Sequence, residues 1–330
     1  MTGIAVWAGL AFILSAGATS LLLYVLLPFF ARYALARPNA RSSHKVPTPQ
    51  GGGAVIVVSS LGFGIGIGLA TQSLLMPWLP FVALVLGLAV LGAVDDLKSL
   101  GWRPRLIVQA LCVGGMLLVL PAEWRVIEAV PLLIERFAAL VLGLWFVNLT
   151  NFMDGIDGIL VAGLMPLFTA LGTGFLGVLP PDPLPMAFAG GLVGFFVLNH
   201  PPARIFAGDV GSLAIGFAAA TLLFQLACGA SLVAAILLPL YFVMDASWTL
   251  LLRIRRKENL AQAHRDHAYQ QAVDSGMPVR HILVRVLMLN LGLAGLAGMT
   301  IALPELGFSA LLAGIAATGW LLYRFRRMKP

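Results

Sequence analysis

Long apolar runs are the feature that most constrains how this chain can fold. A helix needs roughly 20 apolar residues to cross the hydrocarbon core of a bilayer. Long continuous runs, rather than alternating residues, favour helices over a membrane barrel. The sequence therefore predicts an all-α integral membrane protein with about eleven transmembrane helices. The runs lie near residues 5–30, 52–70, 77–94, 104–120, 132–147, 159–179, 184–198, 212–228, 231–252, 282–302 and 306–323.

The composition supports the same conclusion. Hydrophobic residues make up 60% of the 330 residues and charged residues only 11%, whereas a soluble domain has about a quarter charged residues. The formal net charge of +7 is explained by basic residues that face an anionic leaflet, so no nucleic-acid partner is expected. Cys112 and Cys228 form neither a disulfide framework nor a metal-binding pattern.

Basic residues predict the orientation. All of the 21 lysine and arginine residues except Arg125 and Arg136 lie after odd-numbered runs or close to residue 330. The positive-inside rule then puts the N-terminus outside and the C-terminus in the cytoplasm. The run at 5–30 lacks a basic leader and is too long for a signal peptide, so we expect a membrane helix there. No repeat or linker divides the chain, which predicts a single domain over 1–330.

Residues capable of chemistry gather in five loops on the predicted cytoplasmic side. A transporter is a rival class of protein, because carboxylates within the membrane also bind coupling ions. Transporter sites usually lie near the bilayer midplane, often between repeats, and neither feature is seen here. The pattern therefore favours an enzyme or, less economically, a lipid-binding scaffold. The loops lie near residues 31–51, 95–103, 148–158, 199–211 and 253–281.

Three aspartates stand where apolar runs begin or end. Asp95 and Asp96 close one run, and adjacent carboxylates raise each other's pKa unless a cation lies nearby. Asp209 lies in a glycine-rich segment that allows a ligand close approach to the backbone. Each also has a structural interpretation, as a polar membrane stop or a helix cap. Grouped at one membrane boundary, they are candidates for a functional site.

A second set of oxygen-bearing side chains recurs at intervals of three residues. Such neighbours lie close together on a helix, and a break at Gly155 or Gly158 would keep the set converging. Hard cations such as Mg²⁺ prefer these oxygen ligands, whereas capping and turn formation would account for one or two of them. The set comprises Asn148, Asn151, Asp154 and Asp157.

Cationic residues and histidines in the same loops suit phosphate. Gly51 to Gly53 follow hydroxyl-bearing residues and can offer backbone amides to an anion. His264 and His267 could hold Zn²⁺ by spacing, but other zinc ligands are missing. Asp245, within an apolar run, needs a polar partner or an aqueous cavity, and we expect it to support the site from behind. The candidate phosphate-binding residues are Lys45, Lys98, Arg204, His264, Arg265 and His267.

Together the five loops resemble the polyprenyl-phosphate N-acetylhexosamine-1-phosphate transferase family, the glycosyltransferase family 4 type of membrane enzymes. The similarity extends from Ser42 to about Gln270. It implies a bacterial inner-membrane phosphoglycosyltransferase with its site facing the cytoplasm. The implied donor is a UDP-N-acetylhexosamine and the acceptor is undecaprenyl or another polyprenyl phosphate in the lipid bilayer. The products are a polyprenyl diphosphate sugar and UMP, and a homodimer is a candidate assembly.

The resemblance also implies roles for individual residues. We expect Asp209 to bind Mg²⁺, replaceable by Mn²⁺, with Asn151 or Asp154 completing the shell. The lipid phosphate then attacks the β-phosphorus of the donor directly, and Asp95 or Asp96 deprotonates it or holds the metal. The catalytic residues are then Asp95, Asp96, Asp154, Asp157 and His267, the metal ligands Asp209, Asn151 and Asp154, and the substrate-binding residues Lys45, Lys98, Asn148, Arg204, His264 and Arg265.

The late histidine motif distinguishes branches of that family. Branches that initiate peptidoglycan or common antigen carry a run of histidines, whereas Tyr269 and Gln270 follow the motif here. The form in this chain is more similar to enzymes that initiate O-antigen or other surface polysaccharides. A phospho-N-acetylmuramoyl-pentapeptide transferase is the alternative, and the sequence leaves open which N-acetylhexosamine is used.

Overall fold

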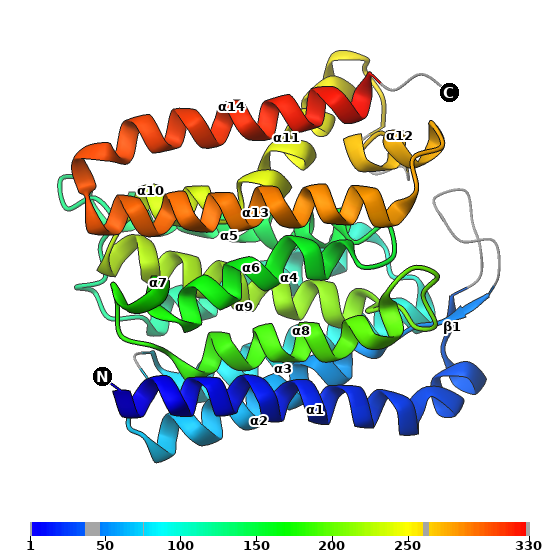
Figure 1. The fold of residues 1–330 in the computed structure, drawn as a ribbon, viewed down its shortest axis with the longest axis horizontal. Coiled ribbons are helices and arrows are strands. Elements are labelled where there is room, and N and C mark those ends of the chain that lie inside the picture. The colour runs from blue at the N-terminus through cyan, green and yellow to red at the C-terminus, as the bar shows by residue number, and fades with distance from the viewer. Residues whose placement is uncertain (1, 37–46, 75, 260–263, 328–330) are drawn as a thin grey trace.

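Helices with roughly aligned axes form almost the whole of the computed structural model, which describes residues 2–36, 47–74, 76–259 and 264–327. Helix α1 begins at one end of the bundle and α14 ends at the other (Figure 1). The helices are α1 (Thr2–Tyr33), α2 (Gly52–Ala70), α3 (Trp78–Lys98), α4 (Trp102–Val119), α5 (Leu132–Met153), α6 (Ile159–Gly172), α7 (Gly174–Gly177), α8 (Pro183–Asn199), α9 (Asp209–Gly229), α10 (Leu232–Leu237), α11 (Leu240–Arg255), α12 (Ala268–Asp274), α13 (Val279–Ala302), the 3-10 turn η1 (Pro304–Leu306) and α14 (Gly307–Arg326).

Eight helices in the described part of the chain are long and apolar enough to cross a membrane, and α6 and α8 are shorter apolar helices. The expected run at 231–252 forms two helices, α10 and α11, which are separated at Leu238 and Pro239. Proline has no backbone N–H to donate within a helix, which explains a break there. The prediction of an all-α membrane protein is confirmed, while the number eleven and the orientation stay predictions.

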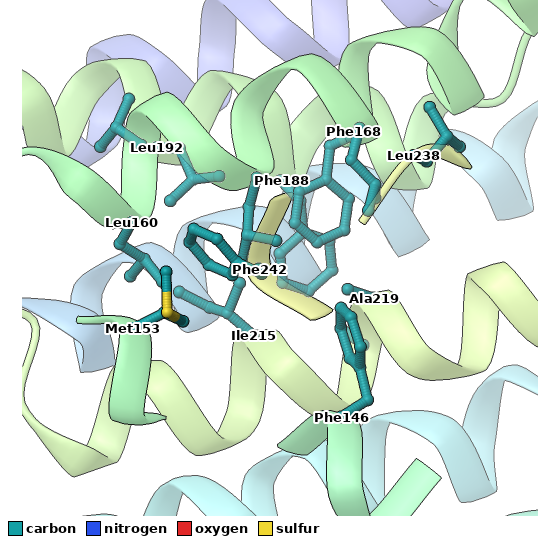
Figure 2. Close-up of a cluster of buried hydrophobic side chains, with 14 of the residues drawn as sticks. Phe146, Met153, Leu160, Phe168, Phe188, Leu192, Ile215, Ala219, Leu238 and Phe242 are labelled. Carbon is teal, nitrogen blue, oxygen red and sulfur yellow. The ribbon is translucent and has the colours of Figure 1, made fainter. Parts of the chain in front are cut away.

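Large aromatic side chains fill the centre of the bundle (Figure 2). Phe168 of α6 and Phe188 of α8 are stacked with ring centroids 5.1 Å apart. Among the eight long apolar helices of the described chain, α9 is the most buried, with 78% of its most apolar stretch inside the protein. Because α9 is surrounded by protein rather than lipid, the residues at its start are held in fixed positions.

A short two-stranded sheet forms within the first predicted loop, and the end of this loop is hydrogen-bonded to the fourth loop. Strands β1 (Leu35–Ala36) and β2 (Thr48–Pro49) pair antiparallel. The backbone then continues beside the segment before α9, where Phe206 N–H donates to Pro49 and Gly52 N–H donates to Phe206. These bonds bring the start of α2 to the start of α9.

Glycines permit α3 to approach α9 closely at the same end of the bundle. A Cβ atom on Gly92 of α3 would overlap the backbone of Asp209. Gly53 of α2 and Gly211 of α9 face each other in the same way. The close approach of α3 puts Asp95 and Asp96, one turn beyond Gly92, beside the first residues of α9.

Substitution of Gly92 tests this packing. Gly92→Ala should lower the thermal stability of the detergent-solubilised protein by about 1–3 kcal/mol, because the added methyl group must displace the α9 backbone. Gly87→Ala on the same helix is the matched control, since its Cβ would meet Cys112 Sγ at an ordinary 3.8 Å. Thermal unfolding of both variants checks the expectation, and equal melting temperatures would contradict it.

Candidate active site

A cleft of about 1140 Å³ opens at the end of the bundle where all five predicted loops contribute residues to one lining in the described structure. Its lining comes from β1, α3, α4, α5, α9, α11 and α12 and from the segments next to them. The chain therefore brings together polar residues that are more than a hundred positions apart. The predicted site residues that line it are Asp95, Asp96, Asn148, Asn151, Asp154, Asp157, Asp209, His264 and His267.

Asp96 connects α3 to the start of α9. Its carboxylate oxygens accept hydrogen bonds from the backbone N–H groups of Asp209 at 3.0 Å and Val210 at 3.2 Å. The first N–H groups of a helix have no partner within it, and the helix dipole favours a negative charge there. Asp96 thus serves as an N-terminal anion for α9 and fixes the position of Asp209.

Arg105 of α4 lies between two carboxylates, and the sequence analysis overlooked it. Its guanidinium forms an ion pair with Asp95 and lies 3.4 Å from Asp209 Oδ2. Asp95 Oδ1 also accepts a hydrogen bond from the Leu100 N–H at 2.6 Å. Arg105 enters the sequence analysis only as one of the basic residues that predict the orientation; its position ten residues after Asp95 is the signal that could have identified it.

The two asparagines of α5 are oriented by neighbouring helices. Asn148 Nδ2 donates to Gln109 Oε1 at 2.7 Å and to the Leu144 carbonyl at 2.8 Å. Asn151 Nδ2 donates to Ser212 Oγ of α9 at 3.0 Å. Because the amide nitrogens are engaged with protein, the side-chain oxygens are the groups available for a cation. Gln109 and Ser212 were missed because neither belongs to a charged motif.

The expected break in the Asn and Asp series is present. Helix α5 ends at Met153, α6 begins at Ile159, and Gly158 adopts a φ of 76°. Asp157 Oδ2 accepts a hydrogen bond from the Ala203 N–H at 2.9 Å. Asn199, another residue that the sequence analysis missed, accepts from the Gly158 N–H and donates to the Ile205 carbonyl, each at 2.8 Å. These bonds attach the break to the segment that leads into α9.

Asp154 lies in the cleft just beyond the end of α5. Burial raises the pKa of its carboxyl group to about 7, and the charges of Asp96 and Asp157 raise it further in the same direction. A carboxyl group with this pKa exchanges a proton near neutral pH, and a bound cation would favour its ionised form.

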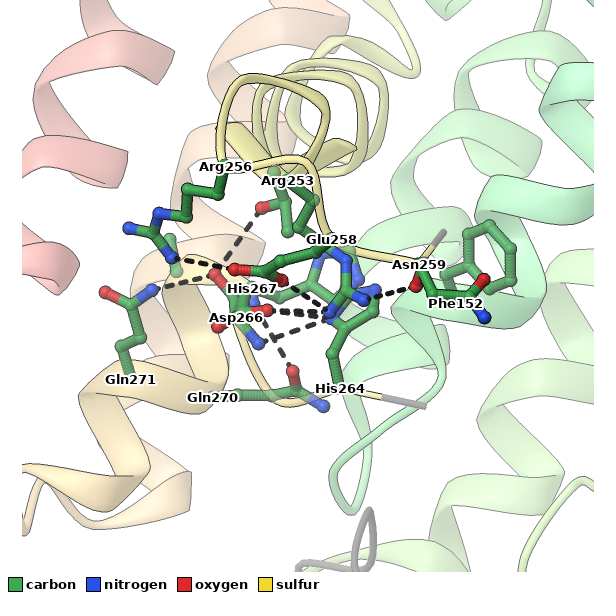
Figure 3. A network of polar contacts seen from close by, with 12 residues as sticks. Phe152, Arg253, Arg256, Glu258, Asn259, His264, Asp266, His267, Gln270 and Gln271 are labelled. Atoms are coloured by element: carbon green, nitrogen blue, oxygen red, sulfur yellow. Dashed lines mark hydrogen bonds and ion pairs between the residues drawn. The ribbon is translucent and has the colours of Figure 1, made fainter. Parts of the chain in front are cut away.

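The segment 264–271, which follows α11 and is called the histidine loop below, is held against the cleft by a polar network (Figure 3). Arg253 of α11, only 3% exposed, pairs with Asp266 at 2.9 Å and donates to the Asn259 carbonyl at 2.8 Å. The rings of His264 and His267 lie 5.1 Å apart. Burial lowers the pKa of His267, so its imidazole is mainly neutral at pH 7.

Tyr269 joins this loop to the end of α5. Its ring stacks on that of His267 with centroids 5.7 Å apart, and its hydroxyl donates to the Phe152 carbonyl at 3.1 Å. A Cβ atom on Gly155 would overlap that hydroxyl. Tyr269 thus sets the separation of His267 from the Asp154 segment, a function that its sequence context did not reveal.

Several predicted site residues do not line the cleft. Lys98, the last residue of α3, and Arg204 are exposed side chains. Arg265 pairs with Asp274 at 2.6 Å on α12 instead. Asp245 is fully buried behind the histidine loop, and Lys45 lies outside the described residues. The structure therefore puts one arginine, Arg105, and two hydrogen-bonding imidazoles, His264 and His267, in the lining of the cleft.

The donor set of the cleft suits a hard cation. No three Asp, Glu, His or Cys side chains converge into a complete metal site among the described residues. However, the carboxylates of Asp95 and Asp209 lie close enough together to share the Arg105 guanidinium. Two carboxylates in contact require a proton or a cation between them. Magnesium commonly takes one or two carboxylates and completes its shell with water and substrate phosphate, so these residues fit it.

Comparisons with known proteins identify similar chains. Residues 78–227 match the model for Glycosyl transferase family 4. A phospho-N-acetylmuramoyl-pentapeptide-transferase of Enterococcus hirae is 33% identical, over 63% of this chain and 65% of the relative. A protein of the same name in Synechococcus sp. (strain JA-3-3Ab) is 36% identical, over 66% of this chain and 68% of the relative. A probable undecaprenyl-phosphate N-acetylglucosaminyl 1-phosphate transferase of Bacillus subtilis (strain 168) is 26% identical, over 75% and 72%.

The raised pKa of Asp154 predicts a pH dependence of stability. An aspartate with a raised pKa binds its proton more tightly in the folded state, so it stabilises the fold at low pH. This contribution is lost as the pH rises from 3.8, the ordinary pKa of an aspartate, through about 7, the pKa of Asp154 in the fold. Between about pH 5 and pH 7, the melting temperature in chelator should fall further in wild type than in Asp154→Asn, by about 2–4 °C. Identical pH profiles of thermal unfolding would contradict the assignment.

Proposed function

Because this chain belongs to glycosyl transferase family 4, we propose that it transfers an N-acetylhexosamine 1-phosphate from a UDP-sugar to polyprenyl phosphate. Membership confirms the family resemblance and the class of enzyme, a phospho-sugar transferase. The membrane helices and the bacterial relatives imply a bacterial membrane protein. In our proposal the cleft faces the cytoplasm, where nucleotide sugars are found.

One observation supports the proposal most strongly. Carboxylates from α3, from the end of α5 and from α9 share a single cleft with Arg105 and with the histidine loop. A phosphoryl-transfer site needs an oxygen-rich cation site together with cationic or neutral hydrogen-bond donors for phosphate. This cleft offers both at one end of an apolar bundle, where a lipid phosphate could reach it from the bilayer.

Different residues of the cleft have different roles in the proposed reaction. Asp209, supported by Asn151 and Asp154, would hold Mg²⁺, which when bound neutralises the donor diphosphate and stabilises the charge on leaving UMP. Arg105, which now neutralises Asp95 and Asp209, would donate to phosphate oxygens once a metal occupies those carboxylates. His264 and His267 line the wall nearest the α5 end and would contact the diphosphate or the sugar.

The attacking group is an oxygen of the lipid phosphate. It forms a bond to the β-phosphorus of the donor while the bond from that phosphorus to the bridging oxygen breaks, which releases UMP. A phosphate monoester has a second pKa of about 6, so it is already largely ionised and needs no strong base. Asp96, whose carboxylate is bound by the α9 amides, is better suited to positioning than to proton transfer.

The histidine loop is the basis on which we propose a branch of the family. We assign the chain to the branch that initiates O-antigen or another surface polysaccharide, because Tyr269 and Gln270 replace a histidine run. A phospho-N-acetylmuramoyl-pentapeptide transferase is the second candidate, since two of the relatives above bear that name. Tyr269 favours the first candidate because it stands where the second candidate's branch has a further histidine. It carries no imidazole, and its hydroxyl donates to the Phe152 carbonyl of α5.

Loss of the predicted metal ligand should abolish transfer. Asp209→Asn is expected to lower Mg²⁺-dependent formation of radiolabelled lipid product from a UDP-N-acetylhexosamine by at least about 10²-fold, a typical loss when a key electrostatic group is removed. Glu305→Gln, an exposed carboxylate in η1, makes the same chemical change away from the cleft and should leave the rate unchanged. Full activity of a folded Asp209→Asn protein would exclude this metal site.

A donor panel separates the two candidate functions. Purified protein in detergent with Mg²⁺ and undecaprenyl phosphate should convert a UDP-N-acetylhexosamine, and added UMP should reverse the reaction. UDP-N-acetylmuramoyl-pentapeptide should give no lipid product. Product from the pentapeptide donor alone would establish the second candidate instead, and product from neither donor would remove both.

A further inference from the structure

One face of α11 carries three buried polar residues that the proposed reaction does not use. Asp245, Thr249 and Arg253 follow one another at intervals of four, which puts them on one side of the helix. Their side chains are 0%, 1% and 3% exposed. Buried charges in a membrane protein are expensive and usually have specific partners. The partners of this polar face are the histidine loop and the last helix.

The polar face of α11 holds the backbone on both sides of His267. Arg253 pairs with the Asp266 carboxylate at 2.9 Å (Figure 3), and the Thr249 hydroxyl lies 3.5 Å from the Asp266 carbonyl. Asp245 Oδ1 accepts a hydrogen bond from the Ala268 N–H at 2.9 Å. The residues before and after His267 are thus fixed to one helix.

The imidazole of His267 also lies beside Asp245. Its Nδ1 atom is 3.9 Å from Asp245 Oδ1. Within the described residues, neither His267 Nδ1 nor Asp245 Oδ2 has a hydrogen-bond partner. A carboxylate that accepts from Nδ1 fixes the tautomer of a histidine and leaves Nε2 for the substrate side. A small shift of the ring would complete this pair.

Arg326, at the end of α14, provides the charge that balances Asp245. Its Nη2 group donates to Thr249 Oγ1 at 2.7 Å and to Asp245 Oδ1 at 3.5 Å. An unpaired carboxylate in this position would be strongly destabilising. The last helix therefore reaches the residues around His267 through Asp245 and Thr249 of α11, and it also packs directly against α12.

We propose that Asp245, held by Arg326, positions His267 for catalysis, so that the last helix of the chain controls the geometry of the active site. The proposal rests on the proposed transferase function for its catalytic consequence. Asp245 and Arg326 act through His267 and contact no substrate.

The charges around His267 determine how variants shift its titration. Asp245 and Arg253 face it from α11, Arg326 from α14 and Asp266 from its own loop, while His264 and Tyr269 lie against its ring. Arg326 lowers the pKa of His267 and Asp245 raises it. Removal of Arg326 should therefore move the acidic limb of the rate profile to higher pH, and Asp245→Asn should move it to lower pH.

Kinetics of a small set of variants tests the catalytic part. Arg326→Leu should reduce kcat about tenfold or more, the loss expected when a charged hydrogen bond is removed, with KM for the UDP-sugar little changed. Arg326→Lys should recover much of the loss, and Asp245→Asn combined with Arg326→Leu should be less impaired than Arg326→Leu alone. Arg324→Leu, an exposed arginine on the same helix, is the matched control and should match wild type.

Hydrogen exchange provides a readout that needs no activity. In Arg326→Leu, amides of residues 264–271 should exchange faster while those of α13 stay protected. Wild-type kcat and an unshifted acidic limb in Arg326→Leu would overturn the proposal, as would unchanged exchange in the loop. If wild type transfers no sugar phosphate, the proposed function fails, and the exchange data still decide whether Arg326 holds the loop. Should Arg326→Leu not fold, the same measurements on Arg326→Lys and Asp245→Asn decide.

Discussion

The concentration of negative charge at one end of an apolar helix bundle is the constraint on which this structure depends. Buried carboxylates are tolerated only when donors or cations surround them. Asp96 meets this requirement by capping α9, and Asp157 by binding the backbone that leads into α9. Asp95 does so through Arg105. The bonds that satisfy these carboxylates are the same bonds that assemble the cleft, so stability and site geometry have one physical origin.

The negative charge of the cleft is already largely neutralised before any substrate binds. Arg105 occupies the space between Asp95 and Asp209, and Asp154 has a pKa near neutrality. A divalent cation and a diphosphate, entering together, would replace that arrangement with one of similar net charge. The histidine loop, anchored to α11 through Arg253 (Figure 3), also lines the cleft. On our proposal, such a site would accept a cation and a diphosphate without a large change in local charge.

The sequence predicted the helical membrane fold and the acidic residues of the site because both signals are local. Apolar runs show membrane helices directly, and the spacing of Asn151, Asp154 and Asp157 indicated a broken helix that converges on one point. Arg105 and Gln109 were not predicted, because their function arises only when α4 packs beside α3 and α5. Lys98 and Arg204 carry the charge that phosphate requires but lie outside the cleft lining. Charge in a loop does not reveal which way a side chain faces.

The central claim, that carboxylates from separate segments form one cation and phosphate site, is tested most directly with Mn²⁺. Electron paramagnetic resonance of the detergent-solubilised protein should reveal one Mn²⁺ bound per chain, with a hyperfine coupling to ³¹P when UMP is added. Asparagine at position 209 or 154 should weaken the binding, because each removes a carboxylate from the same site. Absence of bound Mn²⁺, or binding that never couples to phosphorus, would contradict the account.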